Sequence, residues 1–339
     1  MSRKGIGSGD PDRIAERLAL LRRRGLVVRG VRAFFEGRGY LEVETPYAVP
    51  TPGEEVHLKV FRTEQHRPDG TVRPLFLHTS PEFAMKRIVA ATHLPVFQMA
   101  RVWRNAEGSR LHAHEFTMLE WYRPHASLSD LMDETEALLR AILPPVLPGA
   151  ASRVAMTPPF ERLTMADAFA RYAGLDLLAT GDDATALAQA ARCDLRAGES
   201  WEDLFFRLLM ERIEPHIGRT CPTFLTHWPA SQAALARRDP ADPRVALRFE
   251  LYADGIELAN AFEELTDPVE QEARFMADRA RRADLYGDDP QATWPMDHAF
   301  LAAVGNMPSC VGIALGLDRL VMLAAGTRRI EDVLWLSGE

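Results

Sequence analysis

The sequence predicts an α+β protein in which an antiparallel sheet is flanked by helices. One predicted hairpin joins apolar-rich strands at 96–103 and 115–121, and a second turns at Asp254-Gly255. Helical periodicity over 12–39 and a mostly helical stretch at 164–215 supply the helices. Because a short hairpin pairs its strands antiparallel, these strands are expected to form an antiparallel sheet.

The other elements follow from turn and capping residues. The first helix is expected to end at Gly39, and an extended segment then runs to Pro46, which stops it. A strand at 76–79 is expected to lead into a helix at 81–91, with Ser80 as N-cap and Pro81 in its first position. The segment 144–159 is rich in Pro, Gly, Ala and Ser and is expected to be a linker. The remaining expected elements are strands at 223–227, 248–258 and 312–317, a helix from Asp318 and a last short strand near Val333.

Composition limits the class of protein. A chain of 339 residues that is 47% hydrophobic can bury a large core. It has no apolar run of about 18 residues and no signal-peptide core, so no membrane span and a cytoplasmic location are predicted. The net charge of -8 argues against broad nucleic-acid affinity, and the run Arg22–Arg24 is interpreted as a solvated helix face.

The three cysteines are distant from one another in the sequence. Cys193, Cys221 and Cys310 have no CxxC spacing. Neither a zinc site nor a disulfide framework is therefore expected, and the thiols are expected to be reduced.

The first hairpin concentrates charged and aromatic residues in and beside its loop. In the second strand Phe116, Glu120 and Tyr122 share one face by the period of two, and Arg104 lies in the loop. Such a loop can hold an anion. The alternative is an amphipathic hairpin whose charges face water.

The second hairpin brings two carboxylates together. The Asp254-Gly255 turn pairs Tyr252 with Glu257, which makes Glu250 and Glu257 neighbours on one face. Adjacent carboxylates repel each other, whereas a magnesium ion between them and substrate phosphates makes their proximity favourable. In the alternative, one carboxylate points to solvent beside Arg248. On a straight strand Glu264 lies on the opposite face, so sharing the pocket requires a bulge or loop near Asn260.

A third feature is the stretch from Gly312 to Arg319. A strand that ends in glycine and opens a helix lets the backbone approach a ligand and puts Arg319 at the helix start. Alone, this pattern favours an ordinary strand-to-helix turn with an Arg-Asp salt bridge.

These features together resemble a known family. Gly39 to Pro46, Arg104 to Phe116 and Gly316 to Arg319 resemble motifs 1, 2 and 3 of the class II aminoacyl-tRNA synthetases, in that order. The segments TSPEFAMKR, EFTMLEWYRPH, HWPASQAALA and GIELANAFEELTD resemble the lysine-type branch, and within it the ligases that attach (R)-β-lysine to elongation factor P. The resemblance spans about residues 15–335. It implies one class II catalytic domain with a helical insertion at about 160–220, dimerising through motif 1.

The resemblance implies a nucleotide site. Arg104 and Arg319 are expected to be catalytic: Arg104 holds the α-phosphate of ATP, and Arg319 and Phe116 sandwich the adenine. Glu250 and Glu257 are expected to bind Mg²⁺. The full set expected to bind ATP is Arg104, Asn105, Glu107, Phe116, Glu257, Leu258, Gly316 and Arg319.

The resemblance also implies an amino-acid pocket. Ser80 and Glu82 are expected to meet the substrate amino group, and Tyr122 and Glu264 the distal ammonium, because buried carboxylates favour a cationic partner. Ala314 stands where lysyl-tRNA synthetases tend to have glycine, and one methyl group is worth about 1–3 kcal/mol of discrimination. The full set expected to bind the substrate is Ser80, Pro81, Glu82, Tyr122, Asn260, Glu264 and Ala314.

The expected reaction is ATP-dependent activation of (R)-β-lysine and transfer to the ε-amino group of a lysine on elongation factor P. Only 38 residues precede Gly39, which leaves no room for the anticodon-binding OB domain of lysyl-tRNA synthetases, so stable tRNA binding is not expected. One alternative is a free-standing lysyl-tRNA synthetase-like enzyme that charges tRNA or makes a small lysyl product. Another is a degenerate binding protein, because Ala106 and Ala113 replace two family ATP contacts; Glu107 and His114 are the candidate substitutes.

Overall fold

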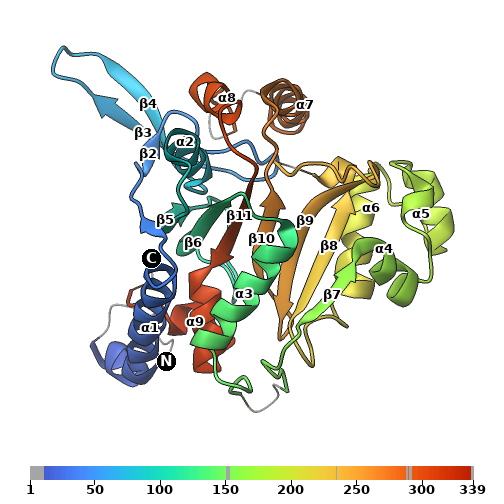
Figure 1. Ribbon diagram of the computed structural model, residues 1–339. Coiled ribbons are helices and arrows are strands. Elements are labelled where there is room, and N and C mark those ends of the chain that lie inside the picture. Colours follow the sequence, from blue (N-terminus) through green and yellow to red (C-terminus); the bar gives the residue numbers. More distant parts are fainter. Residues whose placement is uncertain (1–10, 150–152, 234, 288, 290–291, 337–339) are drawn as a thin grey trace, which may run out of the picture. The chain divides into compact units, whose positions relative to one another are not determined.

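The computed structural model describes residues 11–149, 153–233, 235–287, 289 and 292–336 (Figure 1). The chain divides into two compact units, one formed by residues 1–126 and 265–339 and the other by residues 127–264. No helix among the described residues combines the length and the apolar character that crossing a bilayer requires.

The first unit contains a run of strands in the order β1, β5, β6, β11 (Figure 1). β5 (Val96–Trp103) and β6 (Glu115–Pro124) form the predicted hairpin, and β11 (Cys310–Gly316) pairs antiparallel with the other edge of β6. β1 (Leu41–Glu42) is short and runs parallel to β5, so most of the segment expected to be extended before Pro46 lies outside the sheet.

A separate three-stranded sheet has the order β2-β4-β3. Its strands are β2 (Ala48–Val49), β3 (Phe61–His66) and β4 (Val72–Leu77). The strand predicted near Val333 is wrong. A 3₁₀ turn, Ile330–Asp332, stands there, because the Val333 N–H bonds back to the Ile330 carbonyl.

Five helices are described in the first unit. They are α1 (Pro11–Glu36), α2 (Glu82–Thr92), α7 (Pro268–Tyr286), α8 (His298–Val304) and α9 (Leu317–Ala325). α1 packs on α9, and both α9 and α2 contact β6. Buried side chains on α1, such as Leu21, Val27 and Val31, recur at the spacing of an amphipathic helix.

The start of α2 differs from the prediction. The first helical bond runs from the Met85 N–H to the Pro81 carbonyl, so Pro81 is the N-cap and the helix begins at Glu82. Ser80 lies one residue earlier. Its hydroxyl accepts from the Glu82 N–H at 3.0 Å and donates to Glu120 at 2.5 Å. The serine predicted as a cap therefore joins the helix start to β6.

The second unit contains the strand order β10-β9-β8-β7. Its strands are β7 (Glu161–Thr164), β8 (Thr223–Pro229), β9 (Val245–Ala253) and β10 (Ile256–Glu263). The predicted hairpin between β9 and β10 is confirmed, with Tyr252 opposite Glu257. Asp254 and Gly255 have φ of 54° and 72°, as the two-residue turn requires.

The helices of the second unit are short, apart from the first, which has 15 residues. They are α3 (Leu128–Ile142), α4 (Met165–Ala168), α5 (Ala184–Ala191) and α6 (Trp201–Leu208), with π turns at Phe169–Ala173 and Leu209–Ile213 and 3₁₀ turns at Leu178–Thr180 and Ala230–Gln232. From α4 onward they share a core that includes Trp228 of β8. Antiparallel strands flanked by helices confirm the predicted fold class. The single domain with an insertion stays a prediction.

Candidate functional site

Arg104, just after β5, is the arginine assigned to phosphate. Its guanidinium carbon lies 5.3 Å from the centre of the Phe116 ring, and the backbone N–H of Arg104 donates to the His114 carbonyl at 2.9 Å. Arg104 Nε and Glu107 Oε2 are both buried without a hydrogen-bond partner among the residues that the structure describes. An unmade buried hydrogen bond costs about 1–3 kcal/mol, so a polar ligand that supplied these partners would stabilise the loop.

The first residues of the loop have a constrained backbone. The Asn105 side chain accepts from the Ala106 N–H at 2.8 Å, and the Asn105 N–H donates to the Lys59 carbonyl at 2.8 Å. Ala106 has φ of 61°, which is unusual for a residue other than glycine. Glu107 follows this left-handed residue and is partly buried.

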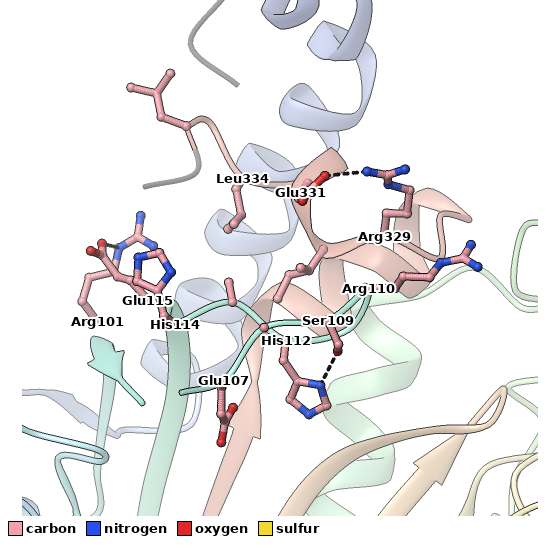
Figure 2. Close-up of a pocket in the computed structure, with 14 residues that line it drawn as sticks. Arg101, Glu107, Ser109, Arg110, His112, His114, Glu115, Arg329, Glu331 and Leu334 are labelled. Carbon is pink, nitrogen blue, oxygen red and sulfur yellow. Dashed lines mark hydrogen bonds and ion pairs between the residues drawn. The ribbon is translucent and has the colours of Figure 1, made fainter. Parts of the chain in front are cut away.

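A pocket of about 420 Å³ borders the same loop and is closed by the C-terminal segment (Figure 2). Among the described residues assigned to ATP, only Glu107 lines it. His114 also lines it, and Figure 2 shows its ring near Arg101 and Glu115. This pocket is therefore distinct from the surface that carries Arg104 and Phe116. The role of His114 as a substitute ATP contact stays a prediction.

Arg319 lies in the first turn of α9, after Gly316, which is the N-cap. A Cβ atom at Gly316 would lie 3.4 Å from Arg319 Cδ, an ordinary van der Waals distance, so the arginine side chain packs directly beside this glycine. Arg319 Nη2 is 2.6 Å from His112 Nε2, and His112 Nδ1 is 2.8 Å from Ser109 Oγ. The motif 3 arginine thus contacts the motif 2 loop through His112, a residue that the sequence did not assign to the site.

The amino-acid side of the first unit centres on Glu120 of β6, which is 0% exposed. Its two carboxylate oxygens accept from the Ser80 hydroxyl at 2.5 Å and the Tyr122 hydroxyl at 2.9 Å. Ala314 of β11 lies opposite Glu120 in the strand register, so its methyl group is on the same face. Two of the assigned substrate residues are therefore held by a carboxyl group that was not assigned a role.

Burial and the nearby Glu82 raise the pKa of Glu120 to about 8. Glu82 itself pairs with Lys86, with 2.5 Å between Oε1 and Nζ, and that lysine is 2% exposed. Pro81, which precedes Glu82, is buried. A cationic substrate beside Glu120 would favour the ionised form of that carboxyl group.

Replacing Glu120 with glutamine is expected to change the pH dependence of stability. The folded pKa of Glu120 lies above the ordinary 4.5, so the native state holds more protons than the unfolded state between about pH 4.5 and 8. Wild-type stability should fall across that window by up to about 1.4 kcal/mol per pH unit from this group, and Glu120→Gln should lose that part of the slope. Urea unfolding at pH 5, 6.5 and 8 measures the difference.

The matched control for this prediction is Glu115→Gln. Glu115 is a partly exposed carboxylate on the same strand. For Glu115→Gln, the free energy of unfolding plotted against pH should run parallel to that of the wild type. A plot for Glu120→Gln that is also parallel to the wild type would contradict the assigned effect of burial.

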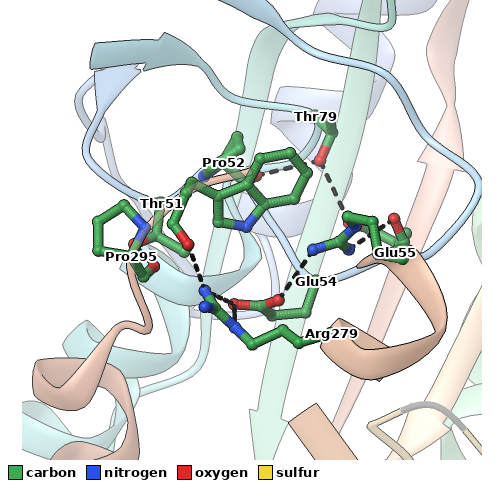
Figure 3. Close-up of polar contacts among 9 residues, drawn as sticks. Thr51, Pro52, Glu54, Glu55, Thr79, Arg279 and Pro295 are labelled. Atoms are coloured by element: carbon green, nitrogen blue, oxygen red, sulfur yellow. Dashed lines mark hydrogen bonds and ion pairs between the residues drawn. The ribbon is translucent and has the colours of Figure 1, made fainter. Parts of the chain in front are cut away.

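The segment 51–55 is held beside Thr79 by a buried ion-pair cluster (Figure 3). Arg279 and Arg282 of α7 both donate to Glu54, and Arg282 also lies 4.1 Å from the Trp294 ring. The Thr79 hydroxyl donates to the Pro52 carbonyl at 3.0 Å. Burial raises the pKa of Glu54, and the two arginines oppose that rise. The cluster thereby supports the chain next to Ser80.

In the second unit, Glu250 is 7% exposed and both of its oxygens have partners. Arg248 donates at 2.6 Å and the Tyr252 hydroxyl at 2.7 Å. Burial and Glu257 together raise the pKa of Glu250 to about 7. Burial, with a contribution from Glu257, also raises the pKa of Glu214. Glu250 therefore does not point to solvent, although Arg248 is its neighbour, whereas Glu257 is half-buried.

These carboxylates fit a hard divalent cation. Carboxylate oxygens are the donors that Mg²⁺ prefers, and a cation would remove the repulsion between Glu250 and Glu257. The described residues contain no group of three or more His, Cys, Asp or Glu side chains arranged to hold a metal unaided. An ion held by these two carboxylates alone would keep coordination positions open for substrate phosphates.

The remaining assigned residues also lie in the second unit. Leu258 is buried, and Asn260 accepts from Arg248 Nε at 3.1 Å. The ladder of β9 and β10 shifts register between Glu257 and Ala259, close to the bulge predicted near Asn260. Glu264 is 2% exposed, just after β10, and its backbone bridges to Ala236.

The chain matches known proteins over most of its length. The family model for class II tRNA synthetases (D, K and N) matches residues 13–337. Proteins named elongation factor P--(R)-beta-lysine ligase from Proteus mirabilis and Sodalis glossinidius are each 43% identical over 323 residues, which is 94% of this chain and of each relative. The protein of that name from Salmonella arizonae is 43% identical over 321 residues, 93% of both chains.

Proposed function

Because the chain belongs to the class II (D, K and N) tRNA synthetase family, we propose that it activates (R)-β-lysine with ATP and transfers it to elongation factor P. The observation that carries the proposal is the β5–β6 hairpin. It bears Arg104 and Phe116 at its loop end and Tyr122 with Glu120 farther along β6. One rigid element therefore presents groups suited to a nucleotide phosphate and to an ammonium group.

In the first step the carboxylate of the amino acid attacks the α-phosphorus of ATP, and pyrophosphate leaves. Arg104 is suited to bind the phosphate that gains charge, since its Nε lacks a partner among the described residues. Phe116 and Arg319 are proposed to hold the adenine between them, and Glu107, Asn105, Leu258 and Gly316 to line the nucleotide. ATP use follows from family membership; these residue roles are part of the proposal.

Glu250 and Glu257 are proposed to hold Mg²⁺, which when bound would neutralise phosphate charge. Tyr252 supports this role because its hydroxyl orients Glu250 at 2.7 Å. Arg248 orients the same carboxylate from the other oxygen and also fixes Asn260. The chain's own contribution is thus to orient Glu250, whose pKa is raised by burial and by Glu257.

In the second step the ε-amino nitrogen of the acceptor lysine attacks the acyl carbon of the adenylate. An amide bond forms, the bond to phosphate breaks, and AMP and a proton leave. No covalent enzyme intermediate is required. Ser80, Glu82 and the Tyr122–Glu120 pair are proposed to hold the ammonium groups of the substrate, with Glu264 as the partner of the distal one. Assembly as a homodimer through motif 1 and a cytoplasmic location complete the proposal.

Amino-acid-dependent exchange of pyrophosphate into ATP tests the first step. We expect exchange with (R)-β-lysine to exceed exchange with α-lysine, because the Ala314 methyl group, which lies opposite Glu120, takes up space in the proposed amino-acid pocket. Labelled β-lysine should then appear on elongation factor P and not on tRNA. Charging of tRNA alone would favour the free-standing lysyl-tRNA synthetase-like enzyme, and no exchange with any amino acid would favour the degenerate binding protein. Either outcome would overturn the proposal.

A further inference from the structure

α9 begins at the point where β11 stops pairing with β6. The last pair in that ladder is Gly316 opposite Met118, and Leu317 already belongs to the helix. The next residue of β6, Thr117, is buried, and its N–H would lack a partner if nothing followed β11. The Asp318 carboxylate takes that position and accepts the Thr117 N–H at 2.6 Å. A side chain thus extends the ladder beyond the end of the strand.

The other oxygen of Asp318 pairs with Arg24 of α1, and both residues are buried, at 1% and 7% exposure. Arg24 also donates to the Thr117 hydroxyl at 3.0 Å. The expectation that Arg22–Arg24 forms a solvated face is therefore wrong for Arg24, although Arg22 and Arg23 are exposed. Arg24 stands three residues from both Leu21 and Val27, on the buried stripe of α1, and that spacing was the available signal.

The chain neighbours of this triad of Arg24, Thr117 and Asp318 are the residues assigned to adenine. Thr117 directly follows Phe116, and Asp318 directly precedes Arg319. Side chains alternate along a strand, so Thr117 points to the face of β6 opposite Phe116. The triad therefore links β6 to α9 on the face of β6 opposite Phe116, and it does not occupy the surface that presents the Phe116 ring.

We propose that Arg24, Thr117 and Asp318 form a positioning triad that sets the separation of Phe116 and Arg319, and thereby the affinity for the adenine ring. The inference rests on the proposed function in taking Phe116 and Arg319 as the adenine-binding pair and Arg104 as the residue that meets phosphate. Arg24 and Asp318 touch no substrate. They act by holding the start of α9 at a defined place along β6, since buried, mutually bonded charges allow little displacement.

The proposal separates two parts of nucleotide binding. The adenine contacts depend on the relative placement of β6 and α9, whereas Arg104 at the end of β5 meets phosphate. A loosened triad should therefore weaken binding of AMP and ATP, while inhibition by inorganic pyrophosphate, which lacks a base, should be retained. A purely structural role would instead lower thermal stability and leave the ratio of these affinities unchanged.

Thr117→Val and Thr117→Ser form the matched test. Valine has the shape of threonine but removes the hydroxyl that Arg24 contacts, and serine keeps it. We expect Thr117→Val to raise the Kd for AMP and the KM for ATP about three- to tenfold, with the KM for lysine unchanged. Thr117→Ser should stay within about twofold of wild type, because its hydroxyl still meets Arg24.

Asp318→Asn is the stronger variant. An asparagine offers one acceptor and one donor where Arg24 and the Thr117 N–H both donate, so one contact must fail. We expect at least about a tenfold loss of AMP affinity by calorimetry. Arg32 lies on the same helix as Arg24 and forms an exposed ion pair with Glu42 of β1. Arg32→Ala is therefore the control and should bind AMP as wild type does.

Folded Thr117→Val protein that binds AMP as tightly as the Thr117→Ser variant would overturn the proposal, even if Asp318→Asn fails to fold. Equal weakening of AMP and pyrophosphate binding would also overturn it. Calorimetry needs no turnover, so a wild-type chain that binds AMP but lacks exchange activity would contradict the proposed function and leave the triad to be judged on its own result.

Discussion

Arg104→Ala is expected to reduce adenylate formation by about 10²–10³-fold, the usual effect of removing one group that stabilises transition-state charge. Arg104 packs 5.3 Å from the Phe116 ring, and its Nε has no partner in the described part of the chain, so the side chain is placed for a ligand. The maximal rate of pyrophosphate exchange at saturating β-lysine measures the effect. Thermal stability should change little by comparison.

Arg101→Ala is the matched control. Arg101 lies on β5, three residues before Arg104, is about two-fifths exposed, and pairs with Glu115 at 3.8 Å. Its removal is expected to cost exchange activity less than about threefold, because exposed ion pairs contribute little. Similar losses in both variants would show that net positive charge near the hairpin matters and that Arg104 has no specific role.

Glu264→Gln should strongly weaken binding of the lysine substrate and leave nucleotide binding unchanged. Glu264 is 2% exposed, and the loss of a buried charge opposite an ammonium group typically costs about 3–5 kcal/mol, or a factor of roughly 10² to 4 × 10³. The KM for β-lysine should rise by that factor. The Kd for ATP, measured by calorimetry in the absence of lysine, should stay at the wild-type value.

The adjacent Glu263→Gln is the control, because Glu263 is partly exposed and forms an ion pair with Arg237. It is expected to leave the KM for β-lysine within about twofold of wild type. Loss of ATP affinity in Glu264→Gln would show that this carboxylate contacts the nucleotide. An unchanged KM for β-lysine would show that it does not contact the amino acid.

The two hairpins could be predicted because their signals are local. The alternation of apolar side chains identified β5 and β6, and the Asp254-Gly255 turn defined the register of Tyr252 opposite Glu257. The same register predicted that Glu250 and Glu257 would be neighbours, and the raised pKa of Glu250 agrees with it.

Other features could not be predicted from local pattern. Serine is a common N-cap residue, so the sequence favoured Ser80 as the cap. In the structure the N-cap is Pro81, and the Ser80 hydroxyl bonds instead to Glu120, which is 40 residues away. The segment at Val333 has strand-like residues, but it forms a 3₁₀ turn whose Ile330 N–H bonds to the Arg110 carbonyl. In each case a hydrogen bond to a residue distant in the sequence, Glu120 or Arg110, stabilised one of several locally allowed conformations.

The amino-acid sequence by itself determined which chemical groups this protein has, the spacing that places them on hairpins and helix starts, and the family to which it belongs. The tertiary structure alone decided which of three consecutive arginines is buried, because Arg24 meets Asp318 across 294 residues of chain. It also decided that Glu120 stays buried between Ser80 and Tyr122 with a raised pKa. The pKa of a carboxyl group depends on its solvent exposure and neighbouring charges, and those exist only once distant segments have packed together.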